Sequence, residues 1–158
     1  MVQENERLEH AQIGRGPYRN FRGERTEYNK GGNRIFTVFL PRDVSDYLED
    51  VGWHVKHKPP YREGEDEQNL LDITVAFDPY PPTVTLISHD GTRTFLNEGN
   101  VEILDNVDIA DATIEIRPYN WEVNGKSGCK AYLKELVVEA KPPRRSLNAR
   151  MGREEEDY

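Results

Sequence analysis

Two stretches near the C-terminal end of the chain place flat rings and cations at every second position. Residues 117–121 read RPYNW, and residues 130–134 read KAYLK, with an Asn-Gly pair at residues 124–125 between them. Aromatic faces can stack on other flat groups, and neighbouring cations can bind anions. The candidate binding residues in this part of the chain are Arg117, Tyr119, Trp121, Lys126, Lys130, Tyr132 and Lys134.

The alternation predicts two β-strands that pair as a hairpin. One face of residues 112–121 carries Ala112, Ile114 and Ile116, which suit a core, and the opposite face carries the rings and cations. If the strands pair through the connection NGKSG, the rings and cations of both strands share one exposed face. A nucleobase stacked on such a ring gains about 1–3 kcal/mol whatever its identity. Because a duplex hides the faces of its bases, this face favours single-stranded nucleic acid.

A second interpretation of the same residues stays open. Tyr119 and Trp121 could cover the end of a core, and Tyr132 could be a cross-strand packing partner. The lysines could be ordinary solubilising charges, with Glu115 and Glu122 nearby to neutralise them. The sequence pattern alone does not decide between the two interpretations.

Another basic and aromatic stretch lies between residues 17 and 36. Phe36 and either Val38 or Phe39 are expected in the core, and the arginines could simply solubilise a hairpin. The rings and cations in a Gly-rich loop are nevertheless predicted to contact nucleic acid. These candidates are Arg19, Phe21, Arg22, Arg25, Tyr28, Lys30 and Arg34.

Most of the segments that must position these residues are predicted to be strands. Residues 43–52 have apolar positions at helical spacing and end at Gly52, which predicts one short helix. Residues 97–106 are predicted to form a helical turn. Strands are predicted at residues 8–13, 33–41, 53–58, 69–77, 83–88, 93–97, 112–123 and 129–140. Many short strands with two minor helices indicate an all-β, OB-fold-like small β-barrel, with an Ig-like sandwich as the alternative.

Length and composition predict one domain and a tail. The chain has 158 residues, of which 35% are hydrophobic, and its most apolar runs are too short for a membrane helix. We expect an ordered domain at residues 1–141 and a flexible tail at residues 142–158. Cys129 is the only cysteine, so an internal disulfide is excluded, and the N-terminal residues do not resemble a secretion signal. A cytoplasmic protein is expected.

Charge is distributed in blocks along the chain. The net charge is -8, which argues against a uniformly basic nucleic-acid binder. Residues 14–42 nevertheless contain seven Arg or Lys and only two Glu, whereas residues 43–111 contain sixteen acids and four bases. Residues 141–153 are basic, and the final EEEDY is acidic. The charge is therefore segregated into basic and acidic blocks along the sequence.

Two segments of the sequence resemble the bacteriophage single-stranded DNA-binding proteins. These segments are NFRGERTEYNKGGNRIFTVFLP, residues 20–41, and RPYNWEVNGKSGCKAYLKELVV, residues 117–138. The resemblance covers residues 8–140. It implies an OB fold that coats single-stranded DNA without sequence preference during phage replication, recombination and repair, in the cytoplasm of the host.

The last residues resemble the acidic, aromatic-ended tips of single-stranded DNA-binding proteins. In that class, such tips recruit replication enzymes and compete with DNA for the protein's own groove. The corresponding residues here are Glu154, Glu155, Glu156, Asp157 and Tyr158, where Tyr replaces the more familiar Phe. A run of acids beside a ring can fill a basic and apolar partner site, although a solvated terminus remains the alternative.

The sequence offers little for catalysis, cofactors or metals. His54 and His57 would diverge on a strand, and no cluster of Cys or carboxylates completes a metal site. Residues 88–92, SHDGT, are better interpreted as an Asp-Gly turn than as a catalytic triad, because adjacent residues cannot converge as triad members do. We therefore expect a protein that is not an enzyme and carries no cofactor or metal.

Two other classes of protein fit the same sequence. One is a β-sandwich virion or structural protein whose exposed rings are subunit contacts. The other is an adaptor that binds proteins, not DNA, through its acidic middle and tail. Exposed edge strands make a homodimer plausible, and a monomer is the alternative.

Overall fold

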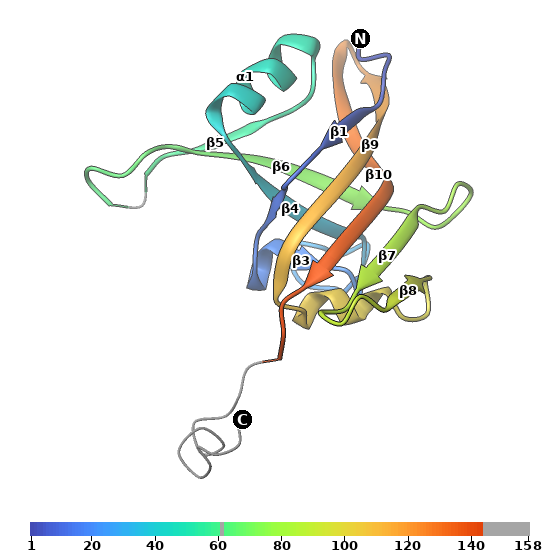
Figure 1. Cartoon of the computed structure of the whole chain (residues 1–158). Coiled ribbons are helices and arrows are strands. Elements are labelled where there is room, and N and C mark those ends of the chain that lie inside the picture. Colours follow the sequence, from blue (N-terminus) through green and yellow to red (C-terminus); the bar gives the residue numbers. More distant parts are fainter. Residues whose placement is uncertain (61, 144–158) are drawn as a thin grey trace.

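The computed structural model describes residues 1–60 and 62–143 and consists mostly of strands (Figure 1). One α-helix, α1 (Arg42–Val51), and two 3-10 helices, η1 (Gly16–Tyr18) and η2 (Val101–Asn106), complete it. The strands are β1 (Glu6–Leu8), β2 (Gln12–Ile13), β3 (Arg19–Asn20), β4 (Arg34–Leu40), β5 (Lys56–Lys58), β6 (Gln68–Val75), β7 (Thr83–Ile87), β8 (Arg93–Leu96), β9 (Ile109–Val123) and β10 (Lys126–Ala140). The all-β prediction with minor helices is confirmed.

The strands form one sheet that curls into a barrel. The main path runs β1-β9-β10-β6-β4-β2, with β3 beside β4, β5 beside β6, and β7 between β10 and β8. The two ends of this path, β1 and β2, are successive parts of one segment. In that segment the Ala11 N–H donates to the Ala112 carbonyl at 2.8 Å, and the Gly14 N–H donates to the Thr37 carbonyl at 2.9 Å. The segment therefore joins β9 to β4 and closes the sheet, which argues against a sandwich of two sheets.

The N-terminal segment is less regular than predicted. Residues 8–13 are not one strand, because His10 has a φ of 55° and separates β1 from β2. This kink lets β1 pair with β9 while β2 pairs with β4. The irregularity is thus the feature that closes the barrel.

The inner positions of the long strands fill the core. Ile114 and Ile116 of β9 and Leu133 of β10 are buried, as the alternation predicts. A β-bulge at Lys134 shifts the register between Leu133 and Glu135, so that Leu136 and Val138 also point inward. Apolar side chains therefore line the interior from Cys129 to Val138 of β10.

Strands β9 and β10 form the long hairpin that crosses the molecule in Figure 1, and a tight turn joins them. Val123 pairs with Lys126, so Asn124 and Gly125 alone form the loop. Both have positive φ, 52° and 79°, as a type I′ turn requires. The Asn-Gly turn predicted from the sequence is confirmed, and β10 begins within the connection NGKSG.

Helix α1 lies where the sequence predicts it. It ends at Gly52, whose φ of 111° is the left-handed conformation common after a helix. Leu48 faces the core, whereas Tyr47 and Val51 are exposed. In the described part of the chain, no helix has the length and apolar character needed to span a membrane.

Candidate nucleic-acid interface

The rings and cations of β9 and β10 gather on one outer face of the hairpin. Arg117 pairs with Tyr132, and Tyr119 pairs with Lys130, so these four side chains project from adjacent positions. We call Arg117, Tyr119, Trp121, Lys130 and Tyr132 the hairpin face. Tyr119 is 49% exposed, and its ring meets the Tyr132 ring edge-on at 5.4 Å. The hairpin therefore positions the predicted residues on one surface.

Arg117 lies between two tyrosine rings. Its guanidinium carbon is 4.9 Å from the Tyr132 ring centre and 5.7 Å from the Tyr80 ring centre. Tyr80 belongs to the loop between β6 and β7, is 70% exposed, and was not predicted from the sequence. These cation–π contacts hold the charge of Arg117 at the surface beside the rings.

Trp121 lies over a glycine of the neighbouring strand. Trp121 pairs with Gly128, and a Cβ atom added to Gly128 would lie 2.6 Å from the indole ring. A glycine at this position lets the ring lie close to the backbone of β10. The flat orientation of Trp121 therefore depends on the absence of a side chain at residue 128.

The two lysines at the ends of the predicted set flank the hairpin face. Lys126 is the first residue after the turn and pairs with Val123. Lys134 lies at the bulge, and its Nζ is 3.5 Å from Glu115 Oε2. The charge of Lys134 is thus partly neutralised within the protein, as the alternative interpretation expected of a lysine near Glu115.

A groove continues the surface between β10 and β5. Strand β6 pairs with β5 through residues 68–70 and with β10 through residues 73 and 74, so Leu71 and Asp72 lie between the two partners. This central groove has a volume of about 260 Å³. Its lining residues are Asn33, Ile35, His54, Lys56, Leu71, Asp72, Thr74, Cys129, Lys130, Ala131 and Tyr132.

A third cluster of ring and cation lies beyond the groove. The Lys58 ammonium donates to the Tyr18 hydroxyl at 3.1 Å and lies 5.7 Å from the centre of its ring. Tyr18 also packs edge-on against Phe39 at 5.1 Å. Basic and aromatic side chains therefore extend from the hairpin face across β5 to Tyr18.

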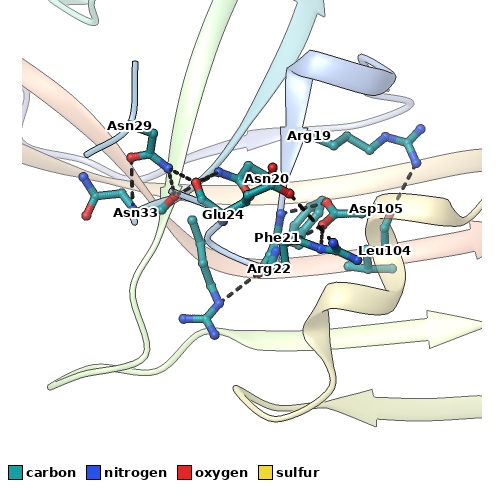
Figure 2. A network of polar contacts seen from close by, with 10 residues as sticks. Arg19, Asn20, Phe21, Arg22, Glu24, Asn29, Asn33, Leu104 and Asp105 are labelled. Carbon is teal, nitrogen blue, oxygen red and sulfur yellow. Dashed lines mark hydrogen bonds and ion pairs between the residues drawn. The ribbon is translucent and has the colours of Figure 1, made fainter. Parts of the chain in front are cut away.

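Arg19 does not face solvent, which corrects its assignment as a binding residue. It is buried, and its Nε donates to the Gly14 carbonyl at 2.6 Å. Its Nη1 donates to the Leu104 carbonyl at 3.1 Å and to the Val107 carbonyl at 2.7 Å, as Figure 2 shows for Leu104. Burial lowers the pKa of Arg19, with a further decrease from nearby Arg15. Arg19 connects β3 to η2 and has a structural role.

Phe21 is also structural, which corrects a second assignment. It is 0% exposed, and its ring stacks on Phe36 at 4.8 Å in the core. The Asp105 carboxylate accepts hydrogen bonds from the backbone N–H groups of Phe21 and Arg22, at 2.8 and 3.1 Å (Figure 2). The hydrogen bonds with Asp105 therefore fix the start of the loop at residues 22–33, and the Phe21 ring packs in the core.

Three further candidates of the loop at residues 22–33 are exposed. Tyr28 is 92% exposed, and Arg25 and Lys30 are exposed beside it. Asn29 holds this loop, because its side chain donates to the carbonyls of Glu24 and Asn33, both at 2.9 Å (Figure 2). The loop thus has a defined shape that presents Tyr28 outward.

Arg22 and Arg34 are partly engaged with the protein. Arg22 is 3.7 Å from Asp105 and 3.8 Å from Glu24. Arg34 donates to the Phe21 carbonyl at 2.9 Å, packs on the Phe77 ring at 5.6 Å, and is 3.6 Å from Glu98. Of the two, Arg22 is the more exposed.

The sequence contained a signal for the groove that the prediction did not use. In WHVKHK, Trp53 and Val55 are buried, whereas His54 and Lys56 line the groove and Lys58 contacts Tyr18. This alternation has the same period as that of the hairpin face. Tyr80 had no such signal, because it lies in a loop. The predicted tail residues, Glu154 to Tyr158, lie outside the described residues.

His57 lies on the opposite side of β5 from the groove. Its Nε2 is 2.8 Å from Glu49 Oε1, and its Nδ1 is 2.7 Å from Asn69 Oδ1. The hydrogen bond with Glu49, followed by that with Asn69, raises the pKa of His57. The two histidines therefore diverge, as expected, and His57 connects β5 to α1 and β6.

Residues 88–92 form the predicted Asp-Gly turn. The Asp90 carboxylate accepts hydrogen bonds from the Ser88 hydroxyl at 2.5 Å and from the Thr92 N–H at 3.0 Å. These bonds lower the pKa of Asp90 to about 2. Ser88 thus donates to Asp90 within the turn, which is a structural arrangement and not that of a triad.

Comparison with known proteins gives one family and several similar structures. The family model described as "Putative phage ssDNA-binding domain" matches residues 2–144. No curated protein sequence matches the chain. The C-terminally truncated single-stranded DNA-binding protein from bacteriophage Enc34 has a TM-score of 0.55 and 9% identity, covering 89% of this chain and 88% of that chain. The Enc34 protein in complex with ssDNA has a TM-score of 0.53 and 10% identity, covering 90% and 89%.

At such low identity the similar structures show a shared fold, and they confirm the prediction of an OB-fold-like barrel. The family model spans nearly all of the chain up to residue 144. The chain therefore belongs to the family of phage single-stranded DNA-binding domains.

Proposed function

We propose that this protein binds single-stranded DNA without strong sequence preference and uses the hairpin face as its principal contact. The observation that carries the proposal is the arrangement of Arg117, Tyr119, Trp121, Lys130 and Tyr132 on adjacent positions of β9 and β10. Family membership supports the same ligand. The Enc34 protein, which shares the fold, has a structure in complex with ssDNA, and this also supports the proposal.

The chemistry of the hairpin face explains why a single strand is preferred. Tyr119 and Trp121 offer flat rings on which successive bases stack, and every base has such a face. Arg117 and Lys130 contact the phosphates between them, which adds an affinity that falls with salt. A duplex keeps its bases stacked on each other, so only its phosphates remain available to this surface.

We propose that the strand continues from the hairpin face along the central groove. Lys56 and His54 line the groove, and Lys58 with Tyr18 lies beyond it. The loop at residues 22–33 supplies a second flank through Arg25, Tyr28 and Lys30, which are exposed. Arg22 and Arg34 have a smaller role in the proposal, because both have contacts within the protein.

During phage infection, the protein coats and protects single-stranded DNA in replication, recombination and repair, in the cytoplasm of the host cell. It acts by binding and not by catalysis. Its oligomeric state, monomer or homodimer, stays a prediction. Binding to single strands of any sequence suits all of these processes, because each exposes single strands of varied sequence.

The acidic end of the chain has a separate proposed role. Residues 154–158 compete with DNA for the basic surface and recruit replication or recombination proteins, which the sequence EEEDY supports through its charge and terminal ring. Replacing Glu154, Glu155, Glu156 and Asp157 by the corresponding amides in the full chain removes this competitor. The variant is expected to bind single strands more tightly at low salt, and unchanged affinity contradicts the competition.

Fluorescence anisotropy tests the main proposal. The full chain is titrated into a labelled oligo-dT and, separately, into a duplex of equal length, each at two salt concentrations. Tight binding to the single strand that weakens with salt, and much weaker binding to the duplex, is the expected result. Absence of binding to the single strand at low salt overturns the proposal and favours a structural protein.

A further inference from the structure

A carboxylate lies in the middle of the basic surface. Asp72 is on β6 and lines the central groove together with Tyr132 and Lys130. The Thr37 hydroxyl donates to its Oδ1 at 2.7 Å, and the Lys56 ammonium donates to its Oδ2. These two donors come from the neighbouring strands β4 and β5, so the carboxylate is held in one orientation.

This position is unfavourable for a general phosphate-binding surface. A negative charge beside the path of the DNA repels the backbone and neutralises Lys56, which could otherwise contact a phosphate. A structural ion pair explains the contact with Lys56 but does not require the groove. The groove, which has the Tyr132 ring and Thr74 on its sides, provides space next to the carboxylate.

Asp72 can accept further hydrogen bonds, and the polar edge of a base can donate them. A carboxylate has about four lone-pair sites, of which Thr37 and Lys56 use two. Aspartate accepts a hydrogen bond from the N4 amino group of cytosine, whereas thymine presents the O4 acceptor at the corresponding position. At this position a carboxylate therefore attracts the amino group of cytosine and repels O4 of thymine, whose only donor is the neighbouring N3–H, although both pyrimidines can stack on a ring.

We propose that the central groove accepts one nucleobase of the bound strand, and that Asp72 selects bases with an exocyclic amino group over thymine. The inference rests on the proposed single-stranded DNA binding and adds to it a specificity-determining residue. The hairpin face contributes affinity without regard to sequence, and the groove adds a bias in base composition. Only hydrogen bonds form, and no group is transferred.

The test compares oligo-dC with oligo-dT of equal length in a mildly alkaline buffer, by fluorescence anisotropy at one salt concentration. One hydrogen bond discriminates less than a bidentate pair, so oligo-dC is expected to bind about threefold to tenfold more tightly. In Asp72→Asn this ratio is expected to fall to about one or below, because the amide can donate to thymine O4.

Two further variants distinguish base selection by Asp72 from a general effect of negative charge on DNA binding. Glu122→Gln removes one negative charge at an exposed position near the hairpin turn and should leave the ratio unchanged. Thr37→Val removes the hydroxyl that orients Asp72 and should lower the ratio without removing the carboxylate. Circular dichroism of each variant confirms that the barrel is folded.

The outcomes distinguish this inference from the function on which it rests. Equal binding of the two oligonucleotides by the unmodified protein overturns the groove's selectivity but leaves single-strand binding intact. A preference for oligo-dC that persists in Asp72→Asn overturns the role of Asp72. Binding of neither oligonucleotide overturns the proposed function, and the inference with it.

Discussion

Tyr119 and Phe21 occur in similar sequence surroundings, each close to an arginine, but the fold uses them in opposite ways. Tyr119 is 49% exposed on the β9–β10 hairpin, whereas Phe21 is 0% exposed and stacks on Phe36. The arginines differ in the same manner, since Arg117 lies at the surface between two rings and Arg19 is buried among backbone carbonyls. Composition alone therefore does not identify a binding surface.

The difference follows from the local structure of the two regions. Along paired strands, side chains alternate between the two faces, so a run of apolar residues in the core fixes the rings and cations on the outside. Residues 21–33 mostly lie in a loop and have no such period. Their orientation depends on contacts with η2, such as that between Phe21 and Asp105, which are 84 positions apart.

The largest expected effect separates the two aromatic residues by stability. Phe21→Ala leaves a cavity in the core next to Phe36 and should lower the free energy of unfolding by about 3–5 kcal/mol. Urea denaturation followed by circular dichroism measures this loss. Tyr119→Ala, measured in the same way, should change the stability far less, and a loss as large as that of Phe21→Ala contradicts the comparison.

The second prediction concerns binding. Trp121→Ala and Tyr119→Ala each remove a stacking ring and should weaken the binding of oligo-dT by about 1–3 kcal/mol while the barrel stays folded. Anisotropy titration gives the change in Kd, and a thermal melt gives the folding control. If both variants unfold, the rings belong to the core and the assignment of the face is wrong.

Gly128→Ala tests the orientation of Trp121 without removing its ring. An added Cβ lies 2.6 Å from the indole, so the ring must move away from β10. We expect a measurable loss of affinity for oligo-dT that does not exceed the loss in Trp121→Ala. Gly125 is not a suitable control because of its positive φ, whereas Ser127→Ala beside Gly128 is a conservative one. Unchanged binding in Gly128→Ala indicates that the position of the indole is unimportant.

Salt dependence distinguishes two lysines of the same strand. Lys130→Gln should reduce the slope of log K against log salt by about 0.7 if Lys130 contacts one phosphate. Lys134→Gln should reduce the slope less, because Lys134 is 3.5 Å from Glu115. Titrations at several salt concentrations provide both slopes. Equal reductions would indicate that Glu115 does not neutralise Lys134.

The smallest expected effect is on the pH dependence of stability. It depends on His57, which lies on the side of β5 away from the groove. The folded pKa of His57 is raised above its ordinary value of 6.5, chiefly by Glu49. The protonated form is thus stabilised, and its contribution is complete below pH 6.5 and is lost as the pH rises through the folded pKa. The difference in Tm between the unmodified protein and His57→Gln should therefore shrink toward alkaline pH.

Glu49→Gln provides the matched variant for this pH dependence. It removes the acceptor that His57 contacts at 2.8 Å, so it should also lose stability mainly at acidic pH. Thermal melts at several pH values give the Tm of both variants. A difference in Tm that grows with pH has the opposite sign and contradicts the assigned role of His57.

The regular strands were predictable because their signals are local. The Asn-Gly turn, the inward Ile114 and Ile116, and the outward Tyr119 all follow from a period of two residues and a two-residue loop. Helix α1 follows in the same way from helical spacing and Gly52. The outer surface of the hairpin could therefore be derived from the amino-acid sequence alone.

The groove and the buried loop residues could not be predicted in the same way. The groove exists because β6 changes its partner from β5 to β10, which depends on the topology of the whole sheet. Tyr80 approaches Arg117 from a loop, and Arg19 is buried by carbonyls of η2 and the residue that follows it. Contacts between distant segments determine all three features.

Tryptophan fluorescence tests the central claim, that the hairpin face binds the strand, most directly. The chain has two tryptophans, and Trp53 is only 3% exposed whereas Trp121 lies on the hairpin face. In Trp53→Phe, Trp121 is the sole reporter, and its fluorescence should be quenched in proportion to the oligo-dT bound. In Trp121→Phe, the remaining Trp53 should not respond. Binding by anisotropy without quenching of Trp121 would contradict the account, because the strand would then lie on another surface.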